Sequence, residues 1–185
     1  MFVSLVDSGK QRVKTYPMSK TVLLFRHGKS DAGLSGGTDH DRPLNERGRL
    51  DVSLVGDVCT GQGLNIDRIV CSTAVRTYST AVLFAQRFGY DLNEIQLERT
   101  LYLAEPLAYI QAIIQHSQSE RGQSDSMMLV GHNPGISGLA SAWTRSDVDL
   151  PTAAVAHIQL PIDDWRDLSV STQAQLIQLV IPREL

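Results

Sequence analysis

The fold of this chain is decided by the stretch Thr21-Val22-Leu23-Leu24-Phe25-Arg26-His27-Gly28-Lys29-Ser30. Its apolar half, residues 22–25, has the composition and length of a strand that is buried on both faces. The run ends at Arg26-His27-Gly28, so a cation, an imidazole and a flexible residue follow the carboxyl end of the strand. Ligands bind at this edge in open α/β sheets, and the stretch therefore predicts a binding site. Taken alone, it is equally compatible with an ordinary solvated loop.

The composition excludes several classes of protein. The 185 residues suffice for one domain with a substantial core and are too few for two. A net charge of −3 gives no sign of a nucleic-acid or membrane-surface binder, and no apolar run approaches the ~18 residues that span a bilayer. Cys59 and Cys71 form no metal-binding pattern and indicate free thiols. We expect a cytoplasmic protein without nucleic-acid or membrane partners.

The first 19 residues differ from the rest of the chain. They are basic, and their one apolar run, residues 2–6, is shorter than the ~7–15 residue core of a signal peptide. We predict a poorly ordered N-terminal extension over residues 1–19 and a single domain over residues 20–185. Met18, just before the first strand, is a candidate translation start.

Downstream, apolar runs alternate with segments whose apolar residues recur at helical spacing. Strands are predicted at residues 22–25, 66–71, 95–97, 127–130, 153–160 and 176–181. Helices are predicted after the N-cap Asn45, over residues 74–88, and from Pro106 and Pro134 onward. This alternation predicts an α/β fold in three layers, a mostly parallel central sheet with helices on both faces. The stretch between Arg76 and Gly131 is too short to hold a cap domain.

Apolar spacing also predicts which helix faces are buried. In the first helix the expected face is Leu50, Leu54, Val55 and Val58, and in the third it is Leu107, Ile110 and Ile114.

A second informative stretch is Cys71-Ser72-Thr73-Ala74-Val75-Arg76-Thr77, which puts an arginine in the first turn of a helix that follows a strand. The free N–H groups and the dipole of a helix N-terminus favour anions, and Arg76 would strengthen that preference. The alternative is an ordinary surface arginine.

Two further stretches carry side chains toward the same edge of the sheet. Met128-Leu129-Val130-Gly131-His132-Asn133-Pro134-Gly135 repeats the first pattern, and its His132 would face the same edge as His27. Asp41-Arg42-Pro43-Leu44, followed by Gly48, contains an arginine that either pairs with an acid or lines the pocket.

Together these stretches resemble the histidine phosphatase (phosphoglycerate-mutase-like) superfamily, and within it the small SixA-type phosphohistidine phosphatases. The resemblance is carried by Arg-His-Gly-Lys-Ser-Asp at 26–31, Asp-Arg-Pro-Leu-Asn-Glu-Arg-Gly at 41–48, Leu-Tyr-Leu-Ala at 101–104 and Gly-His-Asn-Pro at 131–134. It covers about residues 20 to 181. One departure is Cys71-Ser72-Thr73-Ala74, where the family more often has Ser-Pro-Ala, although the place of the arginine is kept.

The resemblance implies a role for each matching residue. His27 would be the nucleophile that forms a covalent phosphohistidine. Arg26 and Arg76 would bind the phosphoryl oxygens, and His132 would stabilise their charge from the other side. Glu105 lies roughly where larger relatives supply a general acid, but a glutamate that complements the dipole of its helix is the favoured reading.

A cationic cradle can replace a metal in phosphoryl transfer, so we expect no cofactor and no metal ion. The run Asp39-His40-Asp41 and His116 contain possible metal ligands, but we interpret them as solvated loop and helix-end residues.

The resemblance implies a phosphatase without metal whose substrate is a phosphohistidine-bearing protein, for example a histidine phosphotransfer domain. A protonated imidazole leaves without strong acid assistance, and the lack of a cap domain suits a phosphoryl group displayed on another protein. Two alternatives stay open: a phosphatase for small phosphoesters such as sugar phosphates or nucleotides, and an inactive phosphate-binding module.

Overall fold

Strand β1 (Lys20–Arg26) lies inside the sheet, between β6 (Ser126–Gly131) and β7 (Val155–Leu160). The computed structural model describes residues 19–31, 37–119 and 122–185. Its main sheet has the strand order β3-β2-β6-β1-β7-β8. The remaining strands are β2 (Arg68–Ser72), β3 (Gln96–Glu98) and β8 (Gln175–Val180). β1, β6, β2 and β3 pair in parallel, whereas β7 and β8 are antiparallel, which confirms a mostly parallel sheet.

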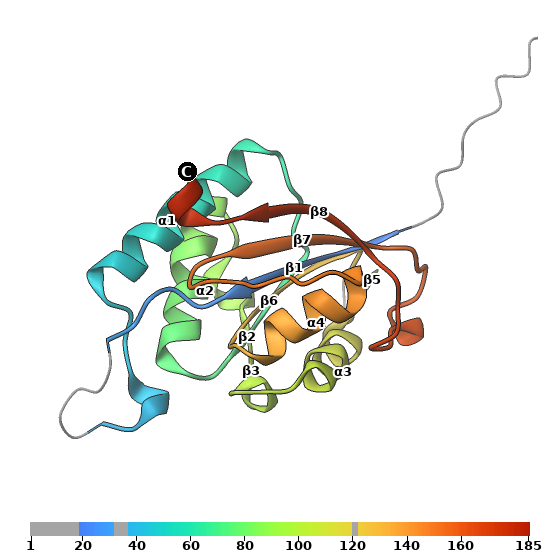
Figure 1. Ribbon diagram of the computed structural model, residues 1–185, viewed down its shortest axis with the longest axis horizontal. Helices are drawn as coiled ribbons and strands as arrows, with labels where there is room; N and C mark the ends of the chain where they lie inside the picture. The colour runs from blue at the N-terminus through green and yellow to red at the C-terminus, as the bar shows by residue number, and fades with distance from the viewer. Residues whose placement is uncertain (1–18, 32–36, 120–121) are drawn as a thin grey trace, which may run out of the picture.

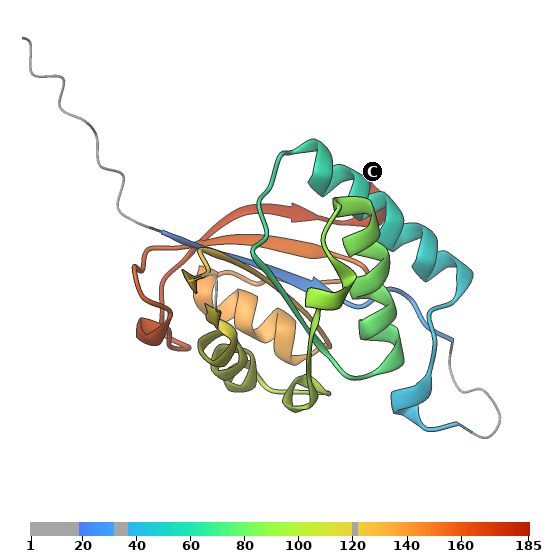
Figure 2. The ribbon, with the colours of Figure 1, turned by 180° about the vertical axis from the view of Figure 1, so that it is seen from behind.

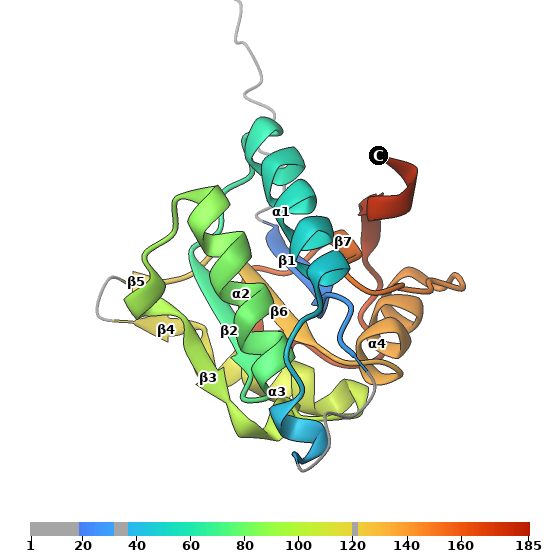
Figure 3. The same cartoon turned by 90° about the vertical axis from the view of Figure 1, so that its left-hand side faces the viewer.

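Helices cover both faces of this sheet. The four are α1 (Glu46–Gly61), α2 (Val75–Phe88), α3 (Pro106–His116) and α4 (Gly135–Thr144). Figure 1 shows α1 and α2 on one side of the sheet and α3 and α4 on the other. From behind, α1 and α2 lie next to each other in front of the strands (Figure 2), and the turned view separates the three layers (Figure 3). The predicted three-layer sandwich is confirmed.

The alternation of side chains along β1 explains why both faces need helices. Leu23 and Phe25 pack into the core under α1 and α2, while Val22 and Leu24 pack into the core under α3 and α4. All four are fully buried, and they link the two cores through one strand.

Between α2 and β6 the described chain contains β3, α3 and a small hairpin, β4 (Gln118–Ser119) with β5 (Gly122–Gln123). No cap domain is inserted there among the described residues. The sequence did not predict the hairpin, nor the 3-10 helix η1 (Asp39–Asp41), which falls in a stretch expected to be loop.

The predicted buried faces of two helices were partly wrong. Leu50 and Leu54 are 63% and 41% exposed, and in α3 Leu107 is 55% exposed. In α1 the inward residues are instead Gly48, Asp51, Val52, Val55, Gly56 and Cys59. A Cβ at Gly48 would lie 2.1 Å from the carbonyl oxygen of Lys29, and one at Gly56 would lie 2.9 Å from the Cβ of Arg87 on α2, so these close contacts set the inward face of α1 and leave its two leucines outward.

The predicted extension over residues 1–19 lies outside the described residues except for Ser19. The Ser19 hydroxyl accepts a hydrogen bond from the Gln159 amide on β7 (2.9 Å). Next to it Lys20 is 3% exposed and pairs with Asp125 at 2.6 Å. Within the described ranges, no helix combines the length and the apolar character needed to cross a membrane.

Candidate active site

The two histidines of the sequence motifs meet at one edge of the sheet. His27 follows β1 and His132 follows β6, and these neighbouring parallel strands are in register up to Arg26 and Gly131. The His27 N–H donates to the carbonyl of Gly131 (3.1 Å), and the two imidazole ring centres are 5.2 Å apart. Parallel strands that end together therefore place the two rings side by side.

The tautomer of His27 follows from its hydrogen bond. Nδ1 lies 2.7 Å from the carbonyl oxygen of Gly28, which can only accept, so Nδ1 carries the proton in the neutral ring. Nε2 is left with a free lone pair. Burial, together with the nearby arginines, lowers the pKa of His27 to about 4, so the ring is neutral at pH 7.

His132 has the opposite tautomer. Its Nδ1 is 3.3 Å from Nη2 of Arg76, which can only donate, and its Nε2 is 3.0 Å from the hydroxyl oxygen of Ser72. Nε2 therefore carries the proton and donates it to Ser72. The His132 ring is 1% exposed, and burial, followed by His27 and Arg76, lowers its pKa to about 3.

The backbone of His132 is held by Tyr109 on α3. The Tyr109 hydroxyl accepts from the His132 N–H (2.9 Å) and donates to the His132 carbonyl (3.3 Å). A Cβ at Gly131 would lie 2.2 Å from that hydroxyl oxygen, so only glycine fits before the histidine. The Gly-His pair in the sequence is thus a consequence of the packing of α3 against β6.

Arg76 is 3% exposed at the start of α2, so the alternative of a surface arginine is excluded. Its Nη1 donates to the carbonyl of Asp39 (2.6 Å) and its Nη2 to the carboxylate of Asp39 (2.9 Å). The Thr80 hydroxyl connects this helix to the first motif, because it accepts from the Gly28 N–H (2.9 Å) and donates to the Arg76 carbonyl (2.7 Å).

Asp39 is a site residue that the sequence analysis missed. Its carboxylate also accepts from the Tyr102 hydroxyl (2.7 Å) and from Nη1 of Arg42 (2.8 Å). The hydrogen bond from Tyr102, then those from the two arginines, hold the pKa of Asp39 well below its usual range. Arg42 therefore pairs with an acid. Tyr102, which the sequence analysis quoted only within the motif Leu-Tyr-Leu-Ala, connects its own segment of the chain to the segment that carries Asp39. The only sequence feature that could have indicated this role is the spacing of three residues between Asp39 and Arg42, which allows the two side chains to form an ion pair.

Arg26, the last residue of β1, directly precedes His27. Its Nη1 donates to the Leu150 carbonyl (2.8 Å), while its Nε is buried and has no hydrogen-bond partner among the described residues. Its charge is close enough to contribute to the lowered pKa of His27. A buried, unpaired donor is costly unless a ligand satisfies it.

The other candidates make no hydrogen bond to His27 or His132 among the described residues. Glu105 is exposed at the N-cap of α3, and its carboxylate accepts no capping hydrogen bond. His116 pairs with Glu98 (3.2 Å), and His40 contacts the Thr73 hydroxyl (3.0 Å). In the part of the chain that the structure describes, no three His, Cys, Asp or Glu side chains are grouped to hold a metal ion.

The two ring pKa values can be measured directly. In a pH titration followed by NMR of the imidazole protons, we expect His27 and His132 to stay neutral down to about pH 4 and about pH 3, well below the ordinary ~6.5. Inorganic phosphate should raise both values, because an anion stabilises the imidazolium. Assignment would use His27→Gln and His132→Gln, and a ring that titrates near 6.5 in the free protein would contradict the burial argument.

Comparisons with known proteins identify the family of the chain. The family model of the histidine phosphatase superfamily (branch 1) matches residues 22–102. An uncharacterized protein of Mycobacterium tuberculosis is 30% identical over 170 residues, covering 86% of this chain and 100% of that protein.

Solved structures agree as well. A structure from Agrobacterium tumefaciens, assigned as the phosphohistidine phosphatase SixA, superposes with a TM-score of 0.69 at 28% identity and covers 90% of this chain and 99% of its own. A mycobacterial glucosyl-3-phosphoglycerate phosphatase shares the fold, with a TM-score of 0.59, 16% identity and coverage of 86% and 97%. The chain thus belongs to the histidine phosphatase superfamily, and its motifs and fold match the SixA-type branch.

Proposed function

We propose that this protein removes phosphate from phosphohistidine on another protein, through a covalent phosphohistidine formed on His27. The observation that carries the proposal is the hydrogen bond from His27 Nδ1 to the Gly28 carbonyl (2.7 Å). It leaves Nε2 of a neutral ring with a lone pair beside two arginines and a second histidine, which is what a nucleophile toward phosphorus needs.

The reaction has two balanced steps. In the first, the substrate ring carries a proton on its other nitrogen, the Nε2 lone pair of His27 forms a bond to phosphorus, and the substrate P–N bond breaks with its electron pair going to the substrate ring, which leaves as neutral imidazole. In the second, water attacks phosphorus, the P–N bond to His27 breaks, and its electrons return to Nε2. The proton from the water passes to solvent, and the product is inorganic phosphate.

Four side chains would bind the transferring phosphoryl group: Arg26, His27, Arg76 and His132. The unpaired Nε of Arg26 would gain an acceptor from a phosphoryl oxygen. An oxyanion near His132 would raise the pKa of that ring, and the resulting imidazolium could donate from Nδ1 as well as from Nε2. For Arg76 to bind the phosphoryl group, its hydrogen bonds to Asp39 have to be shared or released.

The choice of phosphohistidine over an alkyl phosphoester depends on the leaving group. A phosphohistidine ring that is protonated at its other nitrogen leaves as neutral imidazole without help from an enzyme acid, whereas an alkoxide needs a proton from a general acid. Asp39 is ionised at neutral pH, since its pKa is lowered, and cannot supply that proton. Glu105, the remaining candidate acid, is exposed and makes no hydrogen bond to the histidine pair among the described residues. The cationic cradle provides the charge stabilisation for which other phosphatases use a metal.

The test of the proposed function compares substrates. A phosphorylated histidine phosphotransfer domain and free phosphohistidine should be hydrolysed faster than sugar phosphates or nucleotides. A brief reaction with labelled donor, stopped with alkali, should trap an acid-labile phosphoenzyme. EDTA should change neither the rate of substrate hydrolysis nor the rate of phosphoenzyme formation. Preference for a phosphoester would favour the alternative phosphatase, and no turnover of any donor would favour an inactive binding module.

Glu105→Gln distinguishes a phosphohistidine phosphatase from a phosphatase for small phosphoesters. With a phosphohistidine substrate we expect kcat to fall by less than about tenfold, or about 1.4 kcal/mol of barrier, because no strong acid is required. If an alkyl phosphoester were the natural substrate, loss of a true general acid would cost about 10²–10⁴. Glu46→Gln, the same change in the first turn of α1, is the matched control.

A further inference from the structure

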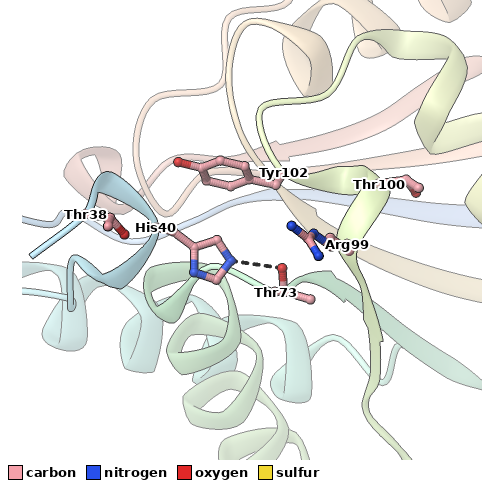
Figure 4. Close-up of a pocket in the computed structure, with 6 residues that line it drawn as sticks. All are labelled: Thr38, His40, Thr73, Arg99, Thr100 and Tyr102. Carbon is pink, nitrogen blue, oxygen red and sulfur yellow. Dashed lines mark hydrogen bonds between the residues drawn. The ribbon is translucent and has the colours of Figure 1, made fainter.

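A pocket of about 730 Å³ opens beside the histidine pair, and no step of the proposed chemistry uses it. Six residues line it: Thr38, His40, Thr73, Arg99, Thr100 and Tyr102. Figure 4 shows the Arg99 guanidinium, the His40 ring and the Thr73 hydroxyl directed toward the same space, under the ring of Tyr102. Its volume lies within the range of pockets that hold small organic groups, roughly 300–1,000 Å³.

Two of the lining residues, Tyr102 and Thr73, adjoin the histidine pair. The Tyr102 ring packs edge-on against the His132 ring, with centres 5.5 Å apart, and on another side against His40 at 5.0 Å. Thr73 directly follows Ser72, the hydrogen-bond partner of His132. A substrate whose phosphoryl group sits at His27 and His132 would therefore extend its neighbouring groups over this pocket.

The charge of the pocket comes from Arg99. The Arg99 side chain is exposed, and its guanidinium makes no hydrogen bond or ion pair with any residue of 19–31, 37–119 or 122–185. No carboxylate is among the described residues that line the pocket, and the acids next to them in sequence already have partners. Glu98 accepts from Thr100 (2.8 Å) and faces His116, and Asp41 accepts from the Thr38 hydroxyl (2.7 Å).

We propose that Arg99 determines specificity by binding an acidic side chain that flanks the phosphohistidine of the protein substrate. The inference rests on the proposed function and adds the charge of the sequence around the phosphorylated residue. A guanidinium matches a carboxylate in two parallel hydrogen bonds, and none of the Arg99 donors is taken by another described residue. The backbone turn that carries Arg99 is closed by the Tyr102 N–H, which donates to the Arg99 carbonyl (3.1 Å). The residue that fixes this turn is therefore the same one whose ring contacts His132.

The test uses three phosphohistidine peptides that are identical except for glutamate, glutamine or lysine at the positions flanking the phosphohistidine. For the unmodified protein at low salt, we expect kcat/KM to be about fivefold higher with glutamate than with glutamine, the effect of an exposed ion pair of about 1 kcal/mol. The preference should vanish in Arg99→Ala, reverse toward lysine in Arg99→Glu, and weaken in high salt.

Arg166→Glu is the matched control, because it makes the same change in charge at η4 (Trp165–Asp167), next to Lys20 and the other end of β1. It should keep the glutamate preference. Phosphohistidine with both ends blocked, as its N-acetyl amide, has no flanking side chain and no free carboxylate, and should be hydrolysed equally by all variants.

Three outcomes would overturn the inference: no charge preference in the unmodified protein, a preference that survives in Arg99→Ala, or an Arg99-dependent preference for carboxylate-bearing small phosphoesters with none among the peptides. Failure to hydrolyse both the blocked phosphohistidine and every peptide would instead reject the proposed function itself.

Discussion

Replacing His27 with alanine is expected to abolish turnover and phosphoenzyme formation. No other described side chain offers a neutral nitrogen with a free lone pair at that strand end, and the Nε2 of His132 already donates to Ser72. Single-turnover measurements with labelled donor, together with intact mass under alkaline conditions, would show the loss. His157→Ala, which removes a histidine from β7, should retain the phosphoenzyme.

The same variant should stay folded. The His27 side chain lies at the edge of the sheet and not between its layers, so its removal leaves both cores intact. A buried neutral histidine takes up its proton more readily when unfolded. The pKa of His27 is lowered to about 4, so the free energy of unfolding should fall between about pH 6.5 and pH 4. His27→Ala should lose less stability over that range, and persistent turnover in this variant would mean that another group is the nucleophile.

The second large effect is expected at Arg76. Arg76→Ala should lower kcat by about 10²–10³, the usual consequence of removing one preorganised group that stabilises developing charge. Arg76→Lys should recover only part of the rate, because an ammonium keeps the charge but cannot form the parallel hydrogen bonds of a guanidinium.

Arg87→Ala is the matched control for Arg76, since it lies in the last turn of the same helix with a largely exposed side chain. It should leave kcat unchanged. The melting temperature of each variant separates loss of chemistry from loss of fold, because Arg76 also anchors Asp39. If Arg76→Ala kept full activity in a folded protein, the cationic cradle would have to be built from other residues.

Much of the architecture was predictable because its signals are local. The apolar run of residues 22–25 indicated a strand buried on both faces, and all four side chains are fully buried. The meeting of His27 and His132 was also foreseeable, since parallel strands in one sheet end at a common edge. The buried faces of α1 and α3 were harder to predict from the sequence. The positions of Gly48 and of the Tyr109 hydroxyl depend on what each helix packs against.

The sequence by itself therefore determined the succession of strands and helices and the two histidines at strand ends, since hydrophobic periodicity and turn residues act over a few neighbours. Only the tertiary structure decided how those histidines are protonated and what Arg76 contacts. Asp39 lies 37 residues from Arg76 and 63 from Tyr102 in the chain, yet its carboxylate joins both. Such contacts depend on the path of a loop and the packing of separate elements, which no local pattern records.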